Sequence, residues 1–299
     1  MNTAGRTLAG VALASFAGMC FGAMGVAAQL LFRYYRFTPG DLVSIRLVGA
    51  GVILLLACWI FTRENLVAPF LHSARNIRDV LLVGAGFYLI QLTFFLSIDA
   101  GNAAIASLMV GFVPLFVILW LAVSARRRVK ATELLCLALA TAGVALLVTK
   151  GDFRSLDFSF LGTFWGIVSA GFGAFCTLMP RGLISRVGVG RAVGWGMVVG
   201  GLIGSIVRPP FGMDVDWSAG SVALYAFIVI FGTVLAFGCY LKSTELVPAS
   251  VTSLLSCFEP LTSVVLTVIL FSVPVNGWEM MGAVCVLANM VILSLEKER

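Results

Sequence analysis

The chain has 299 residues, of which 60% are hydrophobic and only 11% are charged, and its mean hydropathy is +1.05. Soluble domains carry about 25% charged residues, so this composition excludes a soluble protein and predicts an all-α polytopic membrane protein. The formal net charge of +6 does not indicate nucleic-acid binding, because the topology described below accounts for it. All seven cysteines lie in apolar segments, which argues against a disulfide framework, and they form no metal-ligand cluster. No metal or other cofactor is predicted.

Ten apolar runs follow one another along the chain, and a spanning helix needs about 20 mostly apolar residues. The first run is too long for a signal peptide and has a counterpart later in the chain. The seventh is the weakest, but Gly196, Gly200 and Gly204 recur every four residues on one face, where small residues permit close helix packing. These glycines fit contacts within one chain or between chains, so no oligomeric state is predicted and a monomer is allowed. The runs cover residues 8–31, 40–62, 77–98, 102–123, 131–149, 158–180, 191–207, 219–241, 248–271 and 276–295.

The second half of the chain repeats the first. A shift of 146 residues aligns the halves without a gap around helices three and four, and "FGA" at 21–23 recurs at 172–174. We therefore predict two five-helix repeats, residues 1–149 and 158–299. Because five is odd, the second repeat must enter the membrane from the opposite side. Inverted repeats of this kind are typical of secondary transporters. The aligned pairs include Gly86 with Gly232, Ser97 with Ser243, Asp99 with Glu245, Ser107 with Ser253, Phe112 with Phe258, Pro114 with Pro260 and Glu133 with Glu279.

The distribution of lysine and arginine predicts the orientation. If the N-terminus is cytoplasmic, cytoplasmic segments hold 14 of the 20 basic residues, the other side holds five, and Arg46 lies within a span. Basic residues concentrate on the cytoplasmic side of membrane proteins. Both termini are therefore predicted to be cytoplasmic.

Enzymatic chemistry has no support in the sequence. The single histidine, His72, falls in a loop, so no Ser-His or Cys-His arrangement is predicted within the membrane. The segment "GVGRAVG" at 188–194 is a faint dinucleotide-loop pattern without the preceding strand that such a loop needs. The chain has no Walker-type loop, so direct use of ATP is not predicted.

The ninth run places Glu259 next to Pro260 within "SLLSCFEPLTSVV", where a charge costs about 2.5–3.5 kcal/mol at mid-membrane. Pro260 and Pro114 each predict a helix kink, because a mid-helix proline frees the carbonyl four residues earlier. Glu259 has two interpretations: a buried acid that stabilises the kink, or a cavity acid that contacts substrate or carries a proton. Its helical face is polar, whereas the matching face in the first half is apolar. That polar face comprises Thr252, Ser256, Glu259, Ser263 and Thr267.

Further polar and aromatic residues within the spans are candidates for a substrate cavity, and three of them, Tyr88, Gln91 and Phe95, follow one face of the third helix. For each aromatic residue alone, packing or interface anchoring is the simpler interpretation. Arg46 lies near the outer end of the second run, where it is expected to snorkel and to have a structural role. The candidate cavity residues are Gln29, Tyr88, Gln91, Phe95, Ser107, Trp165, Ser169, Tyr240, Ser256 and Glu259.

These features resemble the drug/metabolite transporter superfamily in its ten-helix form with two EamA-type repeats. The resemblance rests on the 5+5 duplication, "FEP" at 258–260, Arg46 in helix two, and Glu279 with Gly282 opening the last helix, echoed by Glu133. Within the superfamily the chain is most similar to bacterial exporters of aromatic amino acids. The resemblance implies an inner-membrane carrier with alternating access and a cavity lined by helices one, three, four, six, eight and nine. Val113 stands where the second repeat has Glu259, which argues against a symmetric acid pair.

The leading hypothesis is therefore a secondary transporter in the lipid bilayer that exports small amphipathic solutes, chiefly aromatic amino acids. Aromatic cavity walls would pack against such a cargo, although no fixed cation near the midplane is evident to bind its carboxylate. The alternative is proton-coupled efflux of lipophilic cations such as methyl viologen, with Glu259 as the counter-charge. A channel would need a continuous polar ring, and an enzyme would need a catalytic constellation.

Overall fold

The computed structural model describes residues 3–63, 65–71, 73–124, 131–149, 159–209, 212–247, 251, 255, 258–272 and 276–296. Within these ranges the chain is helical and contains no strand. The helices are α1 (Thr3–Tyr34), α2 (Pro39–Thr62), α3 (Ala68–Leu71), α4 (Ala74–Ala100), α5 (Ala103–Val110), α6 (Val113–Ser124), α7 (Ala131–Thr149), α8 (Ser159–Leu178), α9 (Arg181–Val187), α10 (Val189–Val207), α11 (Ala219–Val229), η2 (Ile230–Leu235), α12 (Ala236–Thr244), α14 (Phe258–Phe271) and α15 (Gly277–Glu296).

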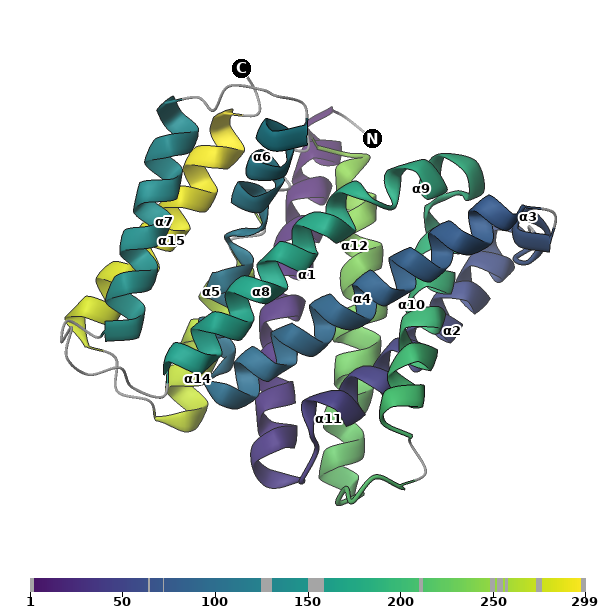
Figure 1. Cartoon of the computed structure of the whole chain (residues 1–299), viewed down its shortest axis with the longest axis horizontal. Helices are drawn as coiled ribbons and strands as arrows, with labels where there is room; N and C mark the ends of the chain where they lie inside the picture. The colour runs from purple at the N-terminus through teal and green to yellow at the C-terminus, as the bar shows by residue number, and fades with distance from the viewer. Residues whose placement is uncertain are drawn as a thin grey trace.

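Seven helical segments of the described chain are long and apolar enough to cross a membrane. Three shorter apolar helices, Leu134–Gly143, Phe258–Phe271 and Gly277–Ala288, correspond to the fifth, ninth and tenth predicted runs. In Figure 1 the start of α1 and the end of α15 lie at the same end of the bundle, as an even number of crossings requires. The chain is thus an all-α polytopic membrane protein.

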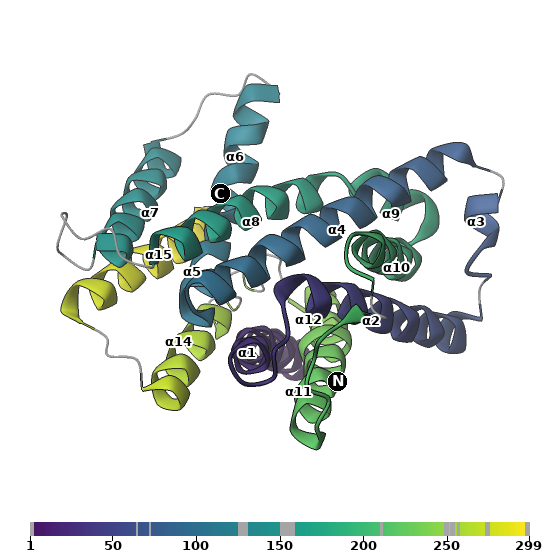
Figure 2. The ribbon, with the colours of Figure 1, turned by 60° about the horizontal axis from the view of Figure 1, so that its bottom comes forward.

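The helices form a central group with a helix pair at each side (Figure 1). Helix α1 runs next to the continuous span α11–η2–α12, and α14 packs against α1 on another side. Helices α4 and α8 pack side by side and run diagonally in front of this centre (Figure 1). Helix α2 packs on α10 at one side, and α7 packs on α15 at the other. Figure 2 shows the same arrangement from below, with the α7–α15 pair at the edge of the bundle.

Glycines bring the helices of one side into close contact. A Cβ on Gly200 would lie 2.6 Å from the carbonyl oxygen of Gly84 in α4, and one on Gly204 would lie 2.9 Å from the ring of Tyr88. All three glycines of the predicted face of α10, Gly196 included, are buried. The prediction that this face permits close packing is confirmed.

The predicted fourth run is divided into α5 and α6. Helix α5 ends at Val110, Gly111 and Phe112 form a turn, and α6 begins at Val113, directly before Pro114. Proline has no N–H to donate to the carbonyl four residues earlier and its ring clashes with that carbonyl. Here that carbonyl belongs to Val110, the last residue of α5, so the interruption lies where the sequence places the kink.

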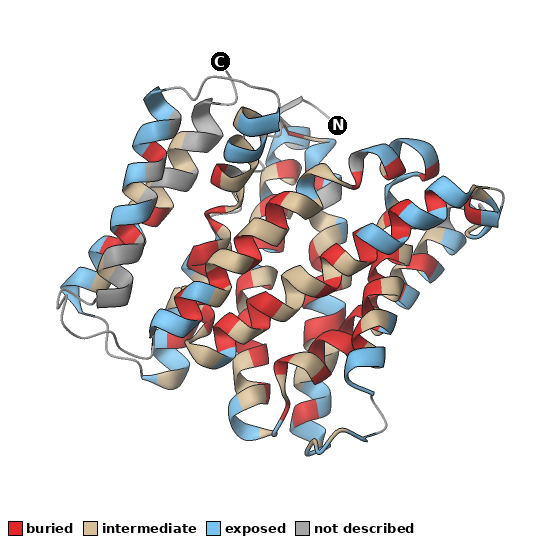
Figure 3. Cartoon of the chain, viewed as in Figure 1, coloured by how far each residue is buried: buried red, intermediate tan, exposed pale blue. Residues whose placement is uncertain are grey.

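The outer surface of the bundle is apolar. Figure 3 shows buried residues gathered along the central helices and exposed ones on the outside and at the ends. Val123 and Ile206 are 82% and 81% exposed, and many other large apolar side chains share this environment. Such a surface would be a liability in water and is what contact with lipid tails requires.

Candidate functional site

Arg46 lies in the interior of the helix bundle. Its side chain is only 1% exposed, although α2 begins seven residues earlier at Pro39. Nε donates a hydrogen bond to Oγ1 of Thr233 at 3.0 Å, and Nη1 donates to Oε1 of Gln91 at 2.9 Å. The expectation that Arg46 snorkels toward the interface is therefore wrong. Its guanidinium turns inward because two neighbouring spans supply acceptors there.

Aromatic side chains surround the guanidinium. Its Cζ lies 5.3 Å from the ring centroid of Phe95 in α4, within the range of a cation–π interaction. Phe95 is fully buried and packs edge to face with Phe32 of α1, with ring centroids 5.8 Å apart. The Tyr225 hydroxyl interacts electrostatically with Arg46 and donates to the backbone oxygen of Ile45 at 3.1 Å. A positive charge thus sits among neutral groups from α4, α11 and η2.

Thr233 is the residue of this site that the sequence analysis missed. It is buried and belongs to η2, a π-helical turn between α11 and α12. π-Helical turns are rare and occur often at functional sites. The only available signal was a threonine inside an apolar run, next to the repeat residue Gly232.

Two of the predicted cavity residues have packing or capping contacts instead. The Gln29 side-chain oxygen accepts a hydrogen bond from the backbone N–H of Ala103 at 2.9 Å and so caps the first turn of α5. Tyr88 is 6% exposed and its ring packs against Gly204 of α10. Although Tyr88 was predicted to share a face with Gln91 and Phe95, its ring lies in the interface between α4 and α10, and it forms no hydrogen bond with Arg46 in the described chain.

The predicted residues of α5 and α8 form no hydrogen bond with Arg46 in the described part of the chain. Ser169 donates a hydrogen bond to the carbonyl oxygen of Ile90 at 3.0 Å and so joins α8 to α4. Trp165 is half-buried and packs edge to face with its neighbour Phe164. Ser107 is fully buried, and its hydroxyl has no hydrogen-bond partner among the described residues.

Glu259 lies where α14 crosses α1. A Cβ on Gly18 would lie 3.3 Å from the backbone nitrogen of Glu259, and one on Gly22 would lie 2.3 Å from its carbonyl oxygen. Glu259 is half-buried and interacts electrostatically with Tyr240 of α12, which is also half-buried. Its carboxyl forms no hydrogen bond or ion pair with the part of the chain that the structure describes. Pro260 is buried in the first turn of α14, whereas Ser256, Thr252 and His72 lie outside the described residues.

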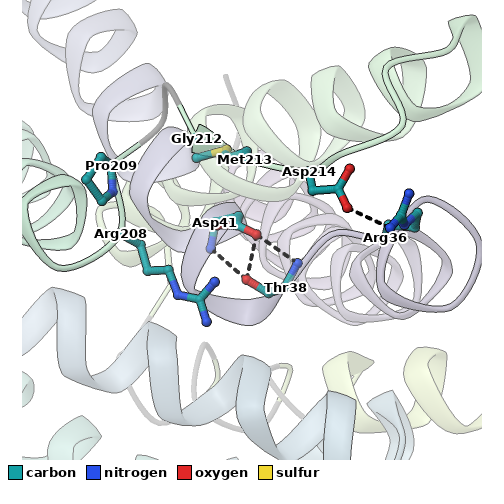
Figure 4. Close-up of a pocket in the computed structure, with 8 residues that line it drawn as sticks. All are labelled: Arg36, Thr38, Asp41, Arg208, Pro209, Gly212, Met213 and Asp214. Atoms are coloured by element: carbon teal, nitrogen blue, oxygen red, sulfur yellow. Dashed lines mark hydrogen bonds and ion pairs between the residues drawn. The ribbon is translucent and has the colours of Figure 1, made fainter.

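A cavity lies at the end of the bundle where α1 meets α2. It has a volume of about 420 Å³ and is formed by the start of α2 and the segment between α10 and α11 (Figure 4). Figure 4 shows the exposed Arg36–Asp214 ion pair at one side and the Thr38–Asp41 turn in the middle. None of the predicted cavity residues lines it. Its lining residues are Arg36, Thr38, Asp41, Arg208, Pro209, Gly212, Met213 and Asp214.

Comparison with known proteins identifies the class. The helical membrane fold and its buried polar centre fit a transporter, and the EamA-like transporter family matches the chain over residues 8–149 and again over 160–295. The chain belongs to this family and is a membrane transporter.

Two relatives illustrate the likeness. The uncharacterized inner membrane transporter YicL of Salmonella typhimurium is 32% identical over 296 residues, which cover 99% of this chain and 98% of that protein. A solved structure described only as the crystal structure of a protein has a TM-score of 0.65 over 99% of this chain and 98% of its own, at 14% identity. At that identity the second likeness shows the fold alone.

Proposed function

We propose that this transporter exports small amphipathic solutes, chiefly aromatic amino acids, and that Arg46 binds the carboxylate of the cargo. The observation that carries the proposal is the buried guanidinium of Arg46, which has only neutral partners. Among the described residues, no aspartate or glutamate lies within ion-pair distance of it. Buried charges in proteins are normally paired, because an isolated ion loses its hydration without compensation. A carboxylate cargo would supply the missing counter-charge.

The hydrogen bonds of Arg46 leave one edge of the guanidinium for a ligand. The group has five N–H donors, one on Nε and two on each terminal nitrogen. Thr233 takes the Nε proton and Gln91 takes one proton of Nη1. Nη1 keeps one of its protons and Nη2 keeps both, and one proton of each nitrogen can lie along the edge that the two nitrogens form. Such an edge binds a carboxylate through two parallel hydrogen bonds, so cargo need not displace either protein partner.

The neighbouring groups suit an aromatic cargo. Phe95 and Phe32 form an edge-to-face pair beside the guanidinium, and aromatic rings pair favourably in that geometry. The guanidinium is closed off in this conformation, so cargo reaches it only when the surrounding helices separate. Alternating movement of the two halves would provide that access.

The proposed location is the inner membrane, with both termini in the cytoplasm. The relative YicL is described as an inner membrane transporter. The 14 basic residues on one side against five on the other support the orientation. The direction of transport then follows from the resemblance to exporters.

A second function has its own support in the structure. The Glu259 carboxyl has no ion-pair partner among the residues described, and its half-buried position next to Tyr240 would suit a lipophilic cation. In that case Glu259 would be the counter-charge and would release protons in exchange for cargo.

Counterflow in proteoliposomes containing only this protein tests both functions. Vesicles are preloaded with unlabelled phenylalanine, phenylalaninamide, threonine or a lipophilic dication, and uptake of labelled solute is followed for wild type, Arg46→Gln and Glu259→Gln. Arg36→Gln is the control, because Arg36 forms an exposed ion pair. We expect exchange of phenylalanine but not of its amide, and loss of that exchange in Arg46→Gln alone. Exchange of the dication only, abolished by Glu259→Gln, would replace the amino acid function with the second one.

A further inference from the structure

The turn that holds Thr233 is wider than an α-helical turn. Helix α11, η2 and α12 form one span, and the Thr233 hydroxyl donates a hydrogen bond to the backbone oxygen of Ile228, five residues earlier, at 2.9 Å. Several hydroxyls in the α-helical spans bond the carbonyl oxygen four residues earlier in their own helix instead. Examples are Ser44 to Gly40, Thr93 to Leu89, Thr177 to Gly173 and Ser205 to Gly201.

The wider turn determines the position of the Thr233 hydroxyl oxygen and its role as a hydrogen-bond acceptor. A hydroxyl has one proton, and Thr233 gives it to Ile228, so its oxygen is left as an acceptor for Nε of Arg46. One residue of α-helix corresponds to a rotation of about 100°. Without the extra residue in the turn, Thr233 would point about a quarter-turn away from the guanidinium.

Close packing against α1 holds this turn in place. A Cβ on Gly232 would lie 2.6 Å from both Cβ and Cγ of Met24 in α1. Only glycine permits the backbone of η2 to approach α1 this closely. The absence of a side chain at Gly232 therefore lets the π-helical turn pack directly on α1.

We infer that the π-helical turn positions the Arg46 guanidinium and that Thr233 is the positioning residue that sets the preference for solutes with a free carboxylate. Thr233 holds Nε and Gln91 holds Nη1, so two hydrogen bonds from different helices fix the plane of the group. The Nη1–Nη2 edge then has one direction, and a planar carboxylate meets both nitrogens at once. A guanidinium free to rotate would keep its charge but lose this preference. The inference rests on the proposed role of Arg46.

Three substitutions test the inference. Thr233→Val keeps the shape of the side chain but removes the hydroxyl, and Thr233→Ser restores it. Thr93→Val is the matched control, because Thr93 is also buried and bonds its own helix but forms no hydrogen bond with Arg46. For each variant the KM of counterflow is measured with phenylalanine and the inhibition constant with phenylalaninamide, which lacks the carboxylate.

We expect Thr233→Val to raise the KM for phenylalanine about tenfold, because a guanidinium that is free to rotate gives the carboxylate one hydrogen bond in place of two, and one hydrogen bond to a charged group is worth about that much. The inhibition constant for phenylalaninamide should not change. Thr233→Ser and Thr93→Val should keep the wild-type ratio of the KM for phenylalanine to the inhibition constant for phenylalaninamide. If Thr233→Val does not reconstitute, Thr233→Cys, of similar size and weaker hydrogen bonding, gives the same comparison.

Three results would overturn the inference, and they differ in whether the proposed role of Arg46 survives. If Thr233→Val keeps the wild-type ratio while Arg46→Gln loses it, Arg46 binds the carboxylate but Thr233 does not position it. If Arg46→Gln also keeps the ratio, the proposed anchor fails together with the inference. A loss in Thr233→Val that Thr233→Ser does not restore would assign Thr233 a packing role only.

Discussion

Substitution of Gly22 by alanine tests the crossing of α1 and α14 that carries Glu259. A Cβ at this position would lie 2.3 Å from the carbonyl oxygen of Glu259, 2.9 Å from Cβ of Thr262 and 3.0 Å from the backbone nitrogen of Ser263. Ordinary contacts begin at 3.4 Å, so α14 must move away from α1 by about 1 Å. Two of these three atoms are backbone and cannot rotate aside.

The expected net effect is destabilising. Alanine is favoured over glycine inside a helix by about 1 kcal/mol, whereas extra atoms in a packed interface cost about 1–3 kcal/mol. Because the clash is with backbone, we expect the upper part of that range and a net loss of about 1–2 kcal/mol in the free energy of unfolding. The displacement of α14 should also slow transport, because it moves Glu259 and Pro260 relative to α1.

Thermal unfolding of the purified protein in detergent, together with counterflow in proteoliposomes, measures both effects. Gly171→Ala and Gly238→Ala are matched controls, because an added Cβ meets nothing within 4 Å at either helical position. These two variants should unfold at the wild-type temperature or slightly above it. If Gly22→Ala unfolds together with the controls and transports at the wild-type rate, α1 and α14 do not cross as described.

Two further predictions concern the ends of helices. Asp79→Asn should clearly lower the unfolding temperature, because it breaks the pair between the buried Asp79 and Arg186 that joins α4 to α9, whereas Glu245→Gln, in an exposed pair, should change stability by less than about 1 kcal/mol. Comparable unfolding temperatures for the two variants would contradict this. Thr38→Ala removes the capping box with Asp41 at the start of α2 and should cost about 1 kcal/mol, measured in the same assay, with transport unchanged.

The parts of the fold that depend on residues near in sequence could be predicted. Apolar runs alone located the spans, because the bilayer imposes a length and excludes charges. The glycine spacing located the packed face of α10, and Pro114 located the interruption between α5 and α6. Each of these features, namely apolar length, glycine spacing and proline position, determines structure within its own helix. The packing of neighbouring helices therefore did not change the outcome.

The candidate site depends on directions that no single helix determines. Tyr88, Gln91 and Phe95 were placed on one face of a regular helix, yet Gln91 and Phe95 meet Arg46 while Tyr88 packs against α10. A long arginine side chain near a helix end can extend either way, and snorkelling is the lower-cost choice when nothing inside the bundle accepts its hydrogen bonds. Here two acceptors were present, and one of them, Thr233, is in position only because of a π-helical turn.

A π-helical turn leaves no clear trace in hydrophobic periodicity, since it adds one residue to a span that is apolar throughout. The turn also packs on α1, where Met24 meets Gly232, and this contact joins residues more than 200 positions apart. The inward direction of Arg46 is therefore a property of three spans together: α2 supplies the charge, α4 supplies Gln91 and Phe95, and η2 supplies Thr233. A site of this kind binds cargo only while those spans keep their relative positions, so the movements that carry cargo across the membrane would also assemble and dismantle the anchor.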